Sequence, residues 1–381
     1  MILRGRAVPL ALAGALGLGG MLPIQPVLAG SGVVLPSFRC RTWTIVPAPA
    51  VDGYYLNSVS GTSSTDVWAV GGDFSGNTPP LALHWDGAAW TQFSVTDGFL
   101  QDVVDISPTD AWAVGPGGYS VYVQHWDGTA WNPVRAPSPG YNYVYGVDAV
   151  SSDDVWMVGN YTRSDFTVQP LTEHWDGRAW KIVQAEELTY GGVLYKVSVV
   201  SSTDVWAVGY QGTSNAFVFQ PLIEHWDGTA WSVVPAAPPP SGTNNQLYGV
   251  GVVSPTDVWA VGVYSTPKPG AQPLIEHWDG VNWTLASLPI LRGVDELFGV
   301  AAASASDVWA VGQSIAPDGD AYRPLTMHWD GAAWTPFRAP PRAINGTLLG
   351  AWALSSQEVL AVGADTPGDA EPLVDRSHGP C

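Results

Sequence analysis

The chain repeats two short phrases in strict alternation, and this repetition limits the possible folds more than any other feature. The first phrase is SxxDVWAVG with close variants, and it begins at Ser63, Ser107, Ser151, Ser201, Ser254 and Ser304, with a degenerate copy at Ser355. The second phrase is HWDGxxW, and it begins at His84, His125, His174, His225, His277 and His328. Successive copies of the first phrase lie 44, 44, 50, 53, 50 and 51 residues apart. Periods of this size are typical of propeller blades and of helical repeats.

The content of each repeat favours blades over helices. In the copy that begins at Leu247, the run LYGVGVVS is followed by a Ser-Pro-Thr-Asp turn, and then by the run VWAVGV. A variable segment leads to PLIEHW, a turn at Asp279 and Gly280, and the short run WTLA. Four short β-rich runs separated by turn residues predict one four-stranded antiparallel blade. Trp226 and Trp231 are expected to face each other across such a hairpin.

The two ends of the chain predict how the ring closes. The seventh unit stops after its third strand, PLVDRS, whereas RTWTIVP from Arg41 matches the outer strand TAWSVVP from Thr229. We therefore predict an all-β fold, a single seven-bladed β-propeller of four-stranded antiparallel blades, over residues 39–381. The amino-terminal strand would complete the last blade. Cys40 and Cys381, the two cysteines of the chain, are predicted to form a disulfide at this closure.

Residues 1–29 read as a secretory signal peptide, with an uncleaved membrane anchor as the alternative. Arg4 and Arg6 precede an apolar run that ends at the small-residue site Val27-Leu28-Ala29. Residues 30–38 would form a short linker. No later stretch is apolar enough to span a membrane, so we expect a secreted protein, and its few lysines with many Ala, Gly and Pro point to a bacterial source.

The charge of the chain excludes one class of partner. The net charge is −19, and removal of the two arginines with the signal peptide makes it −19 − 2 = −21. Such an acidic protein repels nucleic acid and anionic membranes. We expect a monomer that remains soluble outside the cell.

The units resemble kelch repeats and the propeller domain of galactose-oxidase-like proteins. The runs VWAVG and HWDGxxW look like the kelch strand that ends in Gly-Gly and the Tyr-Asp turn before a Trp. Two departures stand out: only Gly71-Gly72 keeps a doubled glycine, and His-Trp-Asp replaces Tyr-Asp. The resemblance implies a propeller but no particular activity, because related propellers include enzymes, lectins and scaffolds.

The sequence does not support a metal or cofactor centre. Six of the seven histidines occupy one repeated position, where a structural hydrogen bond is expected, and His378 stands alone. Copper chemistry of the galactose-oxidase type would need two free histidines, and no phosphate loop, G-x-S-x-G elbow or cysteine nucleophile is present. We therefore predict no cofactor, and we favour a non-catalytic role while leaving the question of activity open.

The connections that vary in length lie on one face of the predicted propeller, which is usually the binding face. Aromatic and amide side chains there suit sugars, although any of them could instead pack the loops. The candidates for this face are Tyr55, Tyr119, Tyr143, Tyr161, Tyr190, Asn245, Tyr264, Tyr322 and Trp352. Trp352 is predicted to lie on an inner strand, where it could project towards the ring axis as a plug or as a platform.

Two neighbouring loops are acidic and could hold Ca²⁺, although solvated charge is the favoured interpretation. The candidate ligands are Asp318, Asp320, Asp365 and Asp369.

Three functions follow from these patterns. We favour a secreted, non-catalytic propeller that presents its variable loops to a glycan or protein partner. The alternatives are an extracellular polysaccharide-active enzyme with a site at the mouth of the central channel, and a purely structural surface protein. Convergent carboxylates at the channel mouth would favour the enzyme.

Overall fold

The computed structural model describes residues 42–49, 53–73, 79–96, 98–117, 119–238, 244–265, 270–291, 293–315, 322–337, 346–356, 358–365 and 371–378. The predicted signal peptide, the linker, Cys40 and Cys381 lie outside these residues. None of the described segments forms a helix with the length and apolarity needed to cross a bilayer.

The described chain is all-β, as predicted, and its strands form four-stranded antiparallel sheets. Six sheets are each built from four consecutive strands. The first three comprise β2 (Tyr54–Ser63), β3 (Asp66–Asp73), β4 (Leu81–Trp85) and β5 (Trp90–Phe93); β6 (Asp102–Ser107), β7 (Asp110–Gly115), β8 (Tyr122–Trp126) and β9 (Trp131–Pro133); and β10 (Tyr141–Ser151), β11 (Asp154–Thr162), β12 (Val168–Trp175) and β13 (Trp180–Val183). The next three comprise β14 (Gly192–Ser201), β15 (Asp204–Gly212), β16 (Phe219–Trp226) and β17 (Trp231–Val233); β18 (Asn245–Ser254), β19 (Asp257–Ser265), β20 (Ala271–Trp278) and β21 (Trp283–Leu285); and β22 (Val294–Ser304), β23 (Asp307–Ile315), β24 (Tyr322–Trp329) and β25 (Trp334–Phe337).

The remaining four strands form a composite sheet from both ends of the described chain. It contains β26 (Gly346–Ser355), β27 (Glu358–Asp365), β28 (Glu371–His378) and β1 (Thr42–Ile45), in the order β1-β28-β27-β26. The prediction of seven blades is therefore corrected to six blades of four consecutive strands and one composite sheet. The fourth strand of the composite sheet comes from the other end of the described chain, because β1 pairs antiparallel with β28. This pairing confirms the prediction that the amino-terminal strand joins the last sheet.

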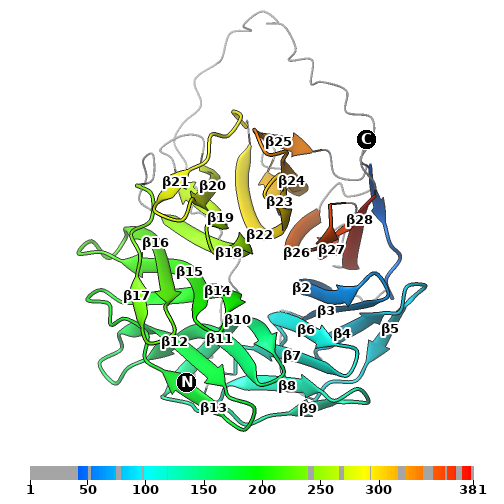
Figure 1. Ribbon diagram of the computed structural model, residues 1–381, viewed down its shortest axis with the longest axis horizontal. Coiled ribbons are helices and arrows are strands. Elements are labelled where there is room, and N and C mark those ends of the chain that lie inside the picture. The colour runs from blue at the N-terminus through cyan, green and yellow to red at the C-terminus, as the bar shows by residue number, and fades with distance from the viewer. Residues whose placement is uncertain are drawn as a thin grey trace, which may run out of the picture.

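The sheets form a ring with their first strands nearest its centre (Figure 1). Each inner strand contacts the inner strand of the next sheet, in the order β2, β6, β10, β14, β18, β22, β26 and back to β2. Most inner strands contain an irregularity in their register, for example between Val144 and Gly146 of β10. Such bulges leave one residue out of the pairing and redirect its side chain.

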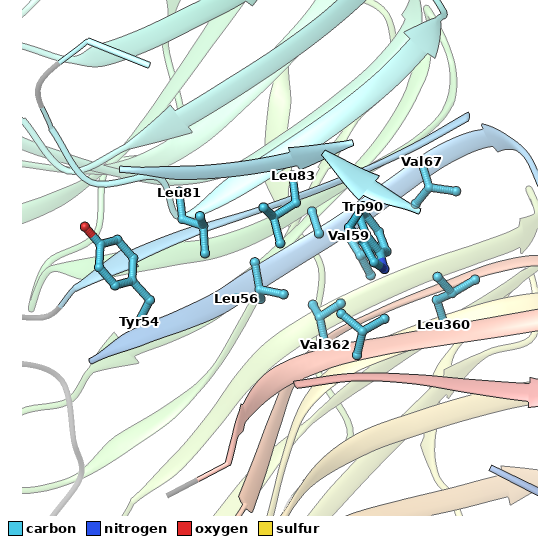
Figure 2. Packing of buried hydrophobic residues seen from close by; sticks show 11 residues of the cluster. Tyr54, Leu56, Val59, Val67, Leu81, Leu83, Trp90, Leu360 and Val362 are labelled. Carbon is cyan, nitrogen blue, oxygen red and sulfur yellow. The ribbon is translucent and has the colours of Figure 1, made fainter. Parts of the chain in front are cut away.

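The hydrophobic core lies between neighbouring sheets. Figure 2 shows one cluster, in which Leu56, Leu83 and Trp90 of the first sheet pack with Leu360 and Val362 of the composite sheet. The repeated tryptophans fill the equivalent spaces elsewhere. Trp68, for example, is fully buried and contacts Trp126 and Trp131 of the following sheet, both with ring centroids 4.9 Å away.

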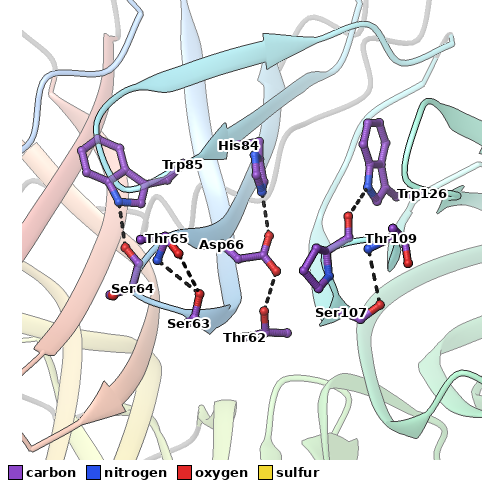
Figure 3. A network of polar contacts seen from close by, with 11 residues as sticks. Thr62, Ser63, Ser64, Thr65, Asp66, His84, Trp85, Ser107, Thr109 and Trp126 are labelled. Carbon is purple, nitrogen blue, oxygen red and sulfur yellow. Dashed lines mark hydrogen bonds and ion pairs between the residues drawn. The ribbon is translucent and has the colours of Figure 1, made fainter.

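The two repeated phrases meet in a fixed contact inside each of the six sheets built from consecutive strands. His84 Nε2 lies 2.7 Å from Asp66 Oδ1 (Figure 3), and the other five histidine–aspartate pairs have distances of 2.7–2.8 Å. The indole of Trp85 donates to the carbonyl of Ser64, which ties the hairpin to the preceding turn. Across the predicted hairpin, Trp226 pairs directly with Trp231. These repeated residues therefore link the strands and turns within each of these blades.

Candidate functional site

The strand order gives the ring two different faces. The Ser–Asp turns after the inner strands and the Asp-Gly hairpins lie on one side, which we call the turn face. The connections between second and third strands, and those between sheets, lie on the other side, which we call the loop face. The loop face carries the variable segments, which is where binding sites usually lie.

Four tyrosines form a continuous row on the loop face, which we call the tyrosine row: Tyr119, Tyr141, Tyr143 and Tyr145. Tyr119, in the connection between β7 and β8, has 84% of its surface exposed. Its ring centroid lies 5.2 Å from that of Tyr141, which lies 5.3 Å from that of Tyr143. The hydroxyls of Tyr141 and Tyr143 are 2.8 Å apart, and the ring of Tyr143 is stacked on Tyr145 at 6.1 Å.

The row continues around the ring as an inner arc of four aromatic residues: Tyr145, Tyr195, Tyr248 and Phe298. Their successive centroid distances are 5.4, 5.3 and 5.6 Å. Each belongs to a different inner strand and occupies its bulge position. Sequence reasoning missed these residues, although their recurrence in VYGV, LYKV, LYGV and LFGV was a usable signal.

The hydroxyl groups of Tyr143, Tyr145, Tyr195 and Tyr248 remain protonated at neutral pH. Burial, with a further contribution from Tyr141, raises the pKa of Tyr143 to about 12. Burial also raises the pKa of Tyr145, Tyr195 and Tyr248. A tyrosine that acts as a general base needs a lowered pKa. The surface is therefore suited to stacking and hydrogen bonding, and not to proton abstraction.

Carboxylates do converge on the inner strands, and hydrogen bonds occupy two of them, Asp102 and Asp148. Asp102 is almost fully buried, and Lys196 Nζ lies 2.5 and 2.6 Å from its two oxygens. Ser58 Oγ and the Val147 N–H also donate to this carboxylate, at 2.5 and 2.8 Å. These residues come from β2, β6, β10 and β14, so we call the group the inter-blade clasp.

Asp148, on β10, is another inner-strand carboxylate. It accepts from the backbone N–H groups of Ala149 and Val199 at 2.9 and 2.8 Å, and burial raises its pKa to about 6. Neither Asp102 nor Asp148 is an unengaged acid facing a substrate. These two carboxylates therefore do not provide the available acid and base that an enzyme would need.

A polar pocket of about 240 Å³ opens between the β11–β12 and β13–β14 connections. It is lined by Arg163, Asp165, Thr167, Gln169, Glu187, Leu188 and Thr189. Arg163 forms an ion pair with Glu187. A hydrogen bond to Tyr161 and the charge of Glu187 raise the pKa of the Arg163 guanidinium.

The loop beside this pocket holds Phe166 in a strained position. Among the described residues other than glycine, Phe166 alone has a positive φ, 66°. Backbone bonds from Phe166 N–H to Arg163 O and from Arg163 N–H to Thr167 O close the turn at 3.0 and 2.9 Å. Such a conformation costs on the order of 1–3 kcal/mol and is found most often at functional sites.

Four of the predicted loop-face candidates fall into two groups, and a fifth, Tyr322, lies apart. Tyr119 and Tyr143 belong to the tyrosine row, whereas Tyr161 and Tyr190 border the polar pocket. Tyr322 begins β24, and 46% of its surface is exposed.

The other candidates have packing contacts. Asn245 is buried and donates to Phe219 O, and Tyr264 packs on the core between sheets. Tyr55 is half-buried, and burial together with Asp73 raises its pKa. Trp352 packs against Gly61 of the neighbouring sheet, where an added Cβ would lie only 3.0 Å from its ring.

The calcium prediction falls largely outside the described residues. This applies to Asp318, Asp320 and Asp369, whereas Asp365 ends β27 and its side chain is not described. Within the described ranges, no three His, Cys, Asp or Glu side chains gather as a metal site would require.

Comparison with known proteins establishes the fold alone. No protein-family model and no curated protein sequence matches the chain. Similar solved structures include YCF48 bound to D1 peptide (14% identity, TM-score 0.59, covering 92% of this chain and 100% of that one). They also include YCF48 from Cyanidioschyzon merolae (16% identity, TM-score 0.58, 88% and 98%) and a PL25 ulvan lyase bound to -[GlcA(1-4)Rha3S]- (9% identity, TM-score 0.60, 87% and 95%). The chain is a β-propeller.

Proposed function

We propose that this protein is a secreted, non-catalytic binding propeller whose loop face takes up a glycan. The tyrosine row carries the proposal, because it begins at an exposed side chain and continues on to the inner strands. Aromatic faces stack on the apolar C–H faces of sugars, and the row also offers phenolic hydroxyls to sugar hydroxyls. Consecutive ring contacts of 5.2–6.1 Å give an extended surface suited to a chain of sugar units.

A glycan is favoured over the two alternatives on chemical grounds. A polysaccharide-active enzyme would need an available acid and base, whereas Asp102 is enclosed by its four donor contacts and the arc tyrosines have raised pKa values. A purely structural role does not account for the exposure of Tyr119. Among similar propellers, one solved structure holds a peptide and another a saccharide, so a peptide ligand remains an outcome of the test below.

The kelch-like identity, export from a bacterial cell and the Cys40–Cys381 disulfide belong to the same proposal. Their support is the repeated phrases, the basic and apolar start, and the pairing of β1 with β28. Mass spectrometry of protein recovered from the culture medium would test the last two. We expect a chain that begins at Gly30 and is lighter than the reduced form by two hydrogen atoms.

Alanine at Tyr119 or Tyr143 should weaken glycan binding by about two- to tenfold each, since one stacking aromatic contributes about 0.5–1.5 kcal/mol. The measurement is a glycan-array screen of the oxidised mature chain, followed by titration calorimetry on the best ligand. Val281→Ala is the control, because it trims an exposed apolar side chain in a hairpin of the turn face and should leave the affinity unchanged. The proposal fails if the folded protein binds no glycan, or if the row variants bind as the native protein does.

A further inference from the structure

The lining of the polar pocket carries a net negative charge. Asp165 and Glu187 provide two carboxylates against the single guanidinium of Arg163, which already pairs with Glu187. Hydrogen bonds from the Thr167 hydroxyl and backbone lower the pKa of Asp165, so that carboxylate is ionised. The whole chain is also acidic, with a net charge of −19. An anionic ligand would therefore meet repulsion both at the pocket and over the surface.

Two exposed aromatic residues, Phe166 and Tyr190, adjoin lining residues of this pocket in the sequence, and we call them its aromatic edge. Phe166 projects with 87% of its surface exposed, between the lining residues Asp165 and Thr167. Tyr190, 57% exposed, directly follows the lining residue Thr189. Exposed aromatic faces attract both sugar rings and positive charge.

The carboxylate at the centre of this loop is held in place. Asp165 Oδ1 accepts from the Thr167 N–H at 3.0 Å and from the Thr167 hydroxyl at 2.6 Å. These bonds use one carboxylate oxygen and leave the other for a ligand. A positioned carboxylate beside aromatic faces matches the chemistry of a sugar-borne ammonium group.

We propose that the pocket binds a glycan with free primary amino groups, whose ammonium contacts Asp165 while its sugar ring stacks on the aromatic edge. The inference depends on the proposed glycan-binding function and specifies the class of sugar. Uronic-acid and sulfated glycans are excluded because Arg163 would have to leave Glu187 to receive them.

The test compares two oligosaccharides of equal length, a hexamer of β-1,4-linked glucosamine and its fully N-acetylated counterpart. By calorimetry at about pH 6, the native protein should bind the glucosamine hexamer about tenfold tighter, the size expected for one charge-assisted hydrogen bond. Asp165→Asn keeps the turn acceptor and should reduce this ratio to near one. Asp153→Asn removes the same charge from an exposed position on the turn face, and should preserve the ratio.

A second variant separates binding from folding. Phe166→Gly relieves the positive φ, so it should leave the melting temperature unchanged or raise it while weakening both hexamers. Equal or tighter binding of the N-acetylated hexamer, or an unchanged ratio in Asp165→Asn, would overturn the amino-sugar inference alone. Failure of every glycan on the array to bind would instead overturn the proposed function.

Discussion

Replacing Asp102 by alanine should lower the free energy of unfolding by about 3–5 kcal/mol, the usual cost of removing one partner of a buried ion pair. The variant leaves the Lys196 ammonium without its two close acceptor contacts. It also deprives Ser58 Oγ and the Val147 N–H of their acceptor. Because these groups belong to four inner strands, the loss should reduce the cooperativity of unfolding as well as its midpoint.

The measurement is urea unfolding monitored by tryptophan fluorescence and by circular dichroism, since divergent curves reveal a loss of two-state behaviour. The matched variant is Asp102→Leu combined with Lys196→Met, which removes both charges and should recover a large part of the lost stability. Lys196→Met alone should resemble Asp102→Ala, because it leaves the carboxylate buried and unpaired. A loss below about 1 kcal/mol for Asp102→Ala would show that solvent screens the pair.

The sequence predicts the blade well because its repeats are local. The turn residues, the apolar runs and the Trp226–Trp231 pair all lie within a single hairpin or a single sheet. The predicted role of the repeated histidines in structural hydrogen bonds also matches the contact of His84 with Asp66, which are 18 residues apart. Short-range patterns of this kind need only the periodicity of strands and the chemistry of turns.

The inner strands were predicted less well because their contacts depend on distant parts of the chain. Lys196 reaches Asp102 across 94 residues and past an intervening sheet, which no spacing rule anticipates. The inner arc depends on bulges, and a bulge moves a side chain out of the alternation on which sequence reasoning relies. Trp352 was placed on the correct strand, but its packing against Gly61 reflects the closeness of the neighbouring sheet.

A second set of buried ionisable side chains lies on the third strands of the sheets. Glu173, Glu224 and Glu276 occupy equivalent positions on β12, β16 and β20, and all three are fully buried. Burial raises the pKa of these carboxyls to about 8, 8 and 7, respectively, from 4.5. Glu276 accepts from the Ala237 N–H at 2.8 Å, in the loop that follows the preceding sheet.

Glu173 differs from the other two in its surroundings. Ala237 lies six residues after Trp231, which begins the outer strand of the sheet before Glu276. In the sheet before Glu173 the equivalent position, six residues after Trp131, is Pro137, which has no N–H to donate. Both Glu173 oxygens are buried without a hydrogen-bond partner among the described residues. Burial therefore opposes the ionisation of Glu173 in the folded protein, and no hydrogen bond offsets it.

The stability of the protein should consequently fall as the pH rises. Above about pH 4.5 the unfolded chain releases protons that the folded protein keeps on these three carboxyls. The free energy of unfolding therefore decreases from about pH 4.5 until the pH passes the folded-state values near 7–8. Asp105, whose pKa burial raises to about 8, contributes in the same direction.

Glu173→Gln should remove one share of this pH dependence and stabilise the protein by about 2–4 kcal/mol at pH 8, since each unit of pKa shift corresponds to about 1.4 kcal/mol. An amide is accommodated at this position, because β8 carries the buried Gln124 there. The measurement is urea unfolding at several values between about pH 4 and pH 9. Asp153→Asn, at an exposed carboxylate of the turn face, is the control and should leave the slope unchanged. If Glu173→Gln gave the native slope, Glu173 would have to ionise in the folded protein at its ordinary pKa, and burial would not control its charge.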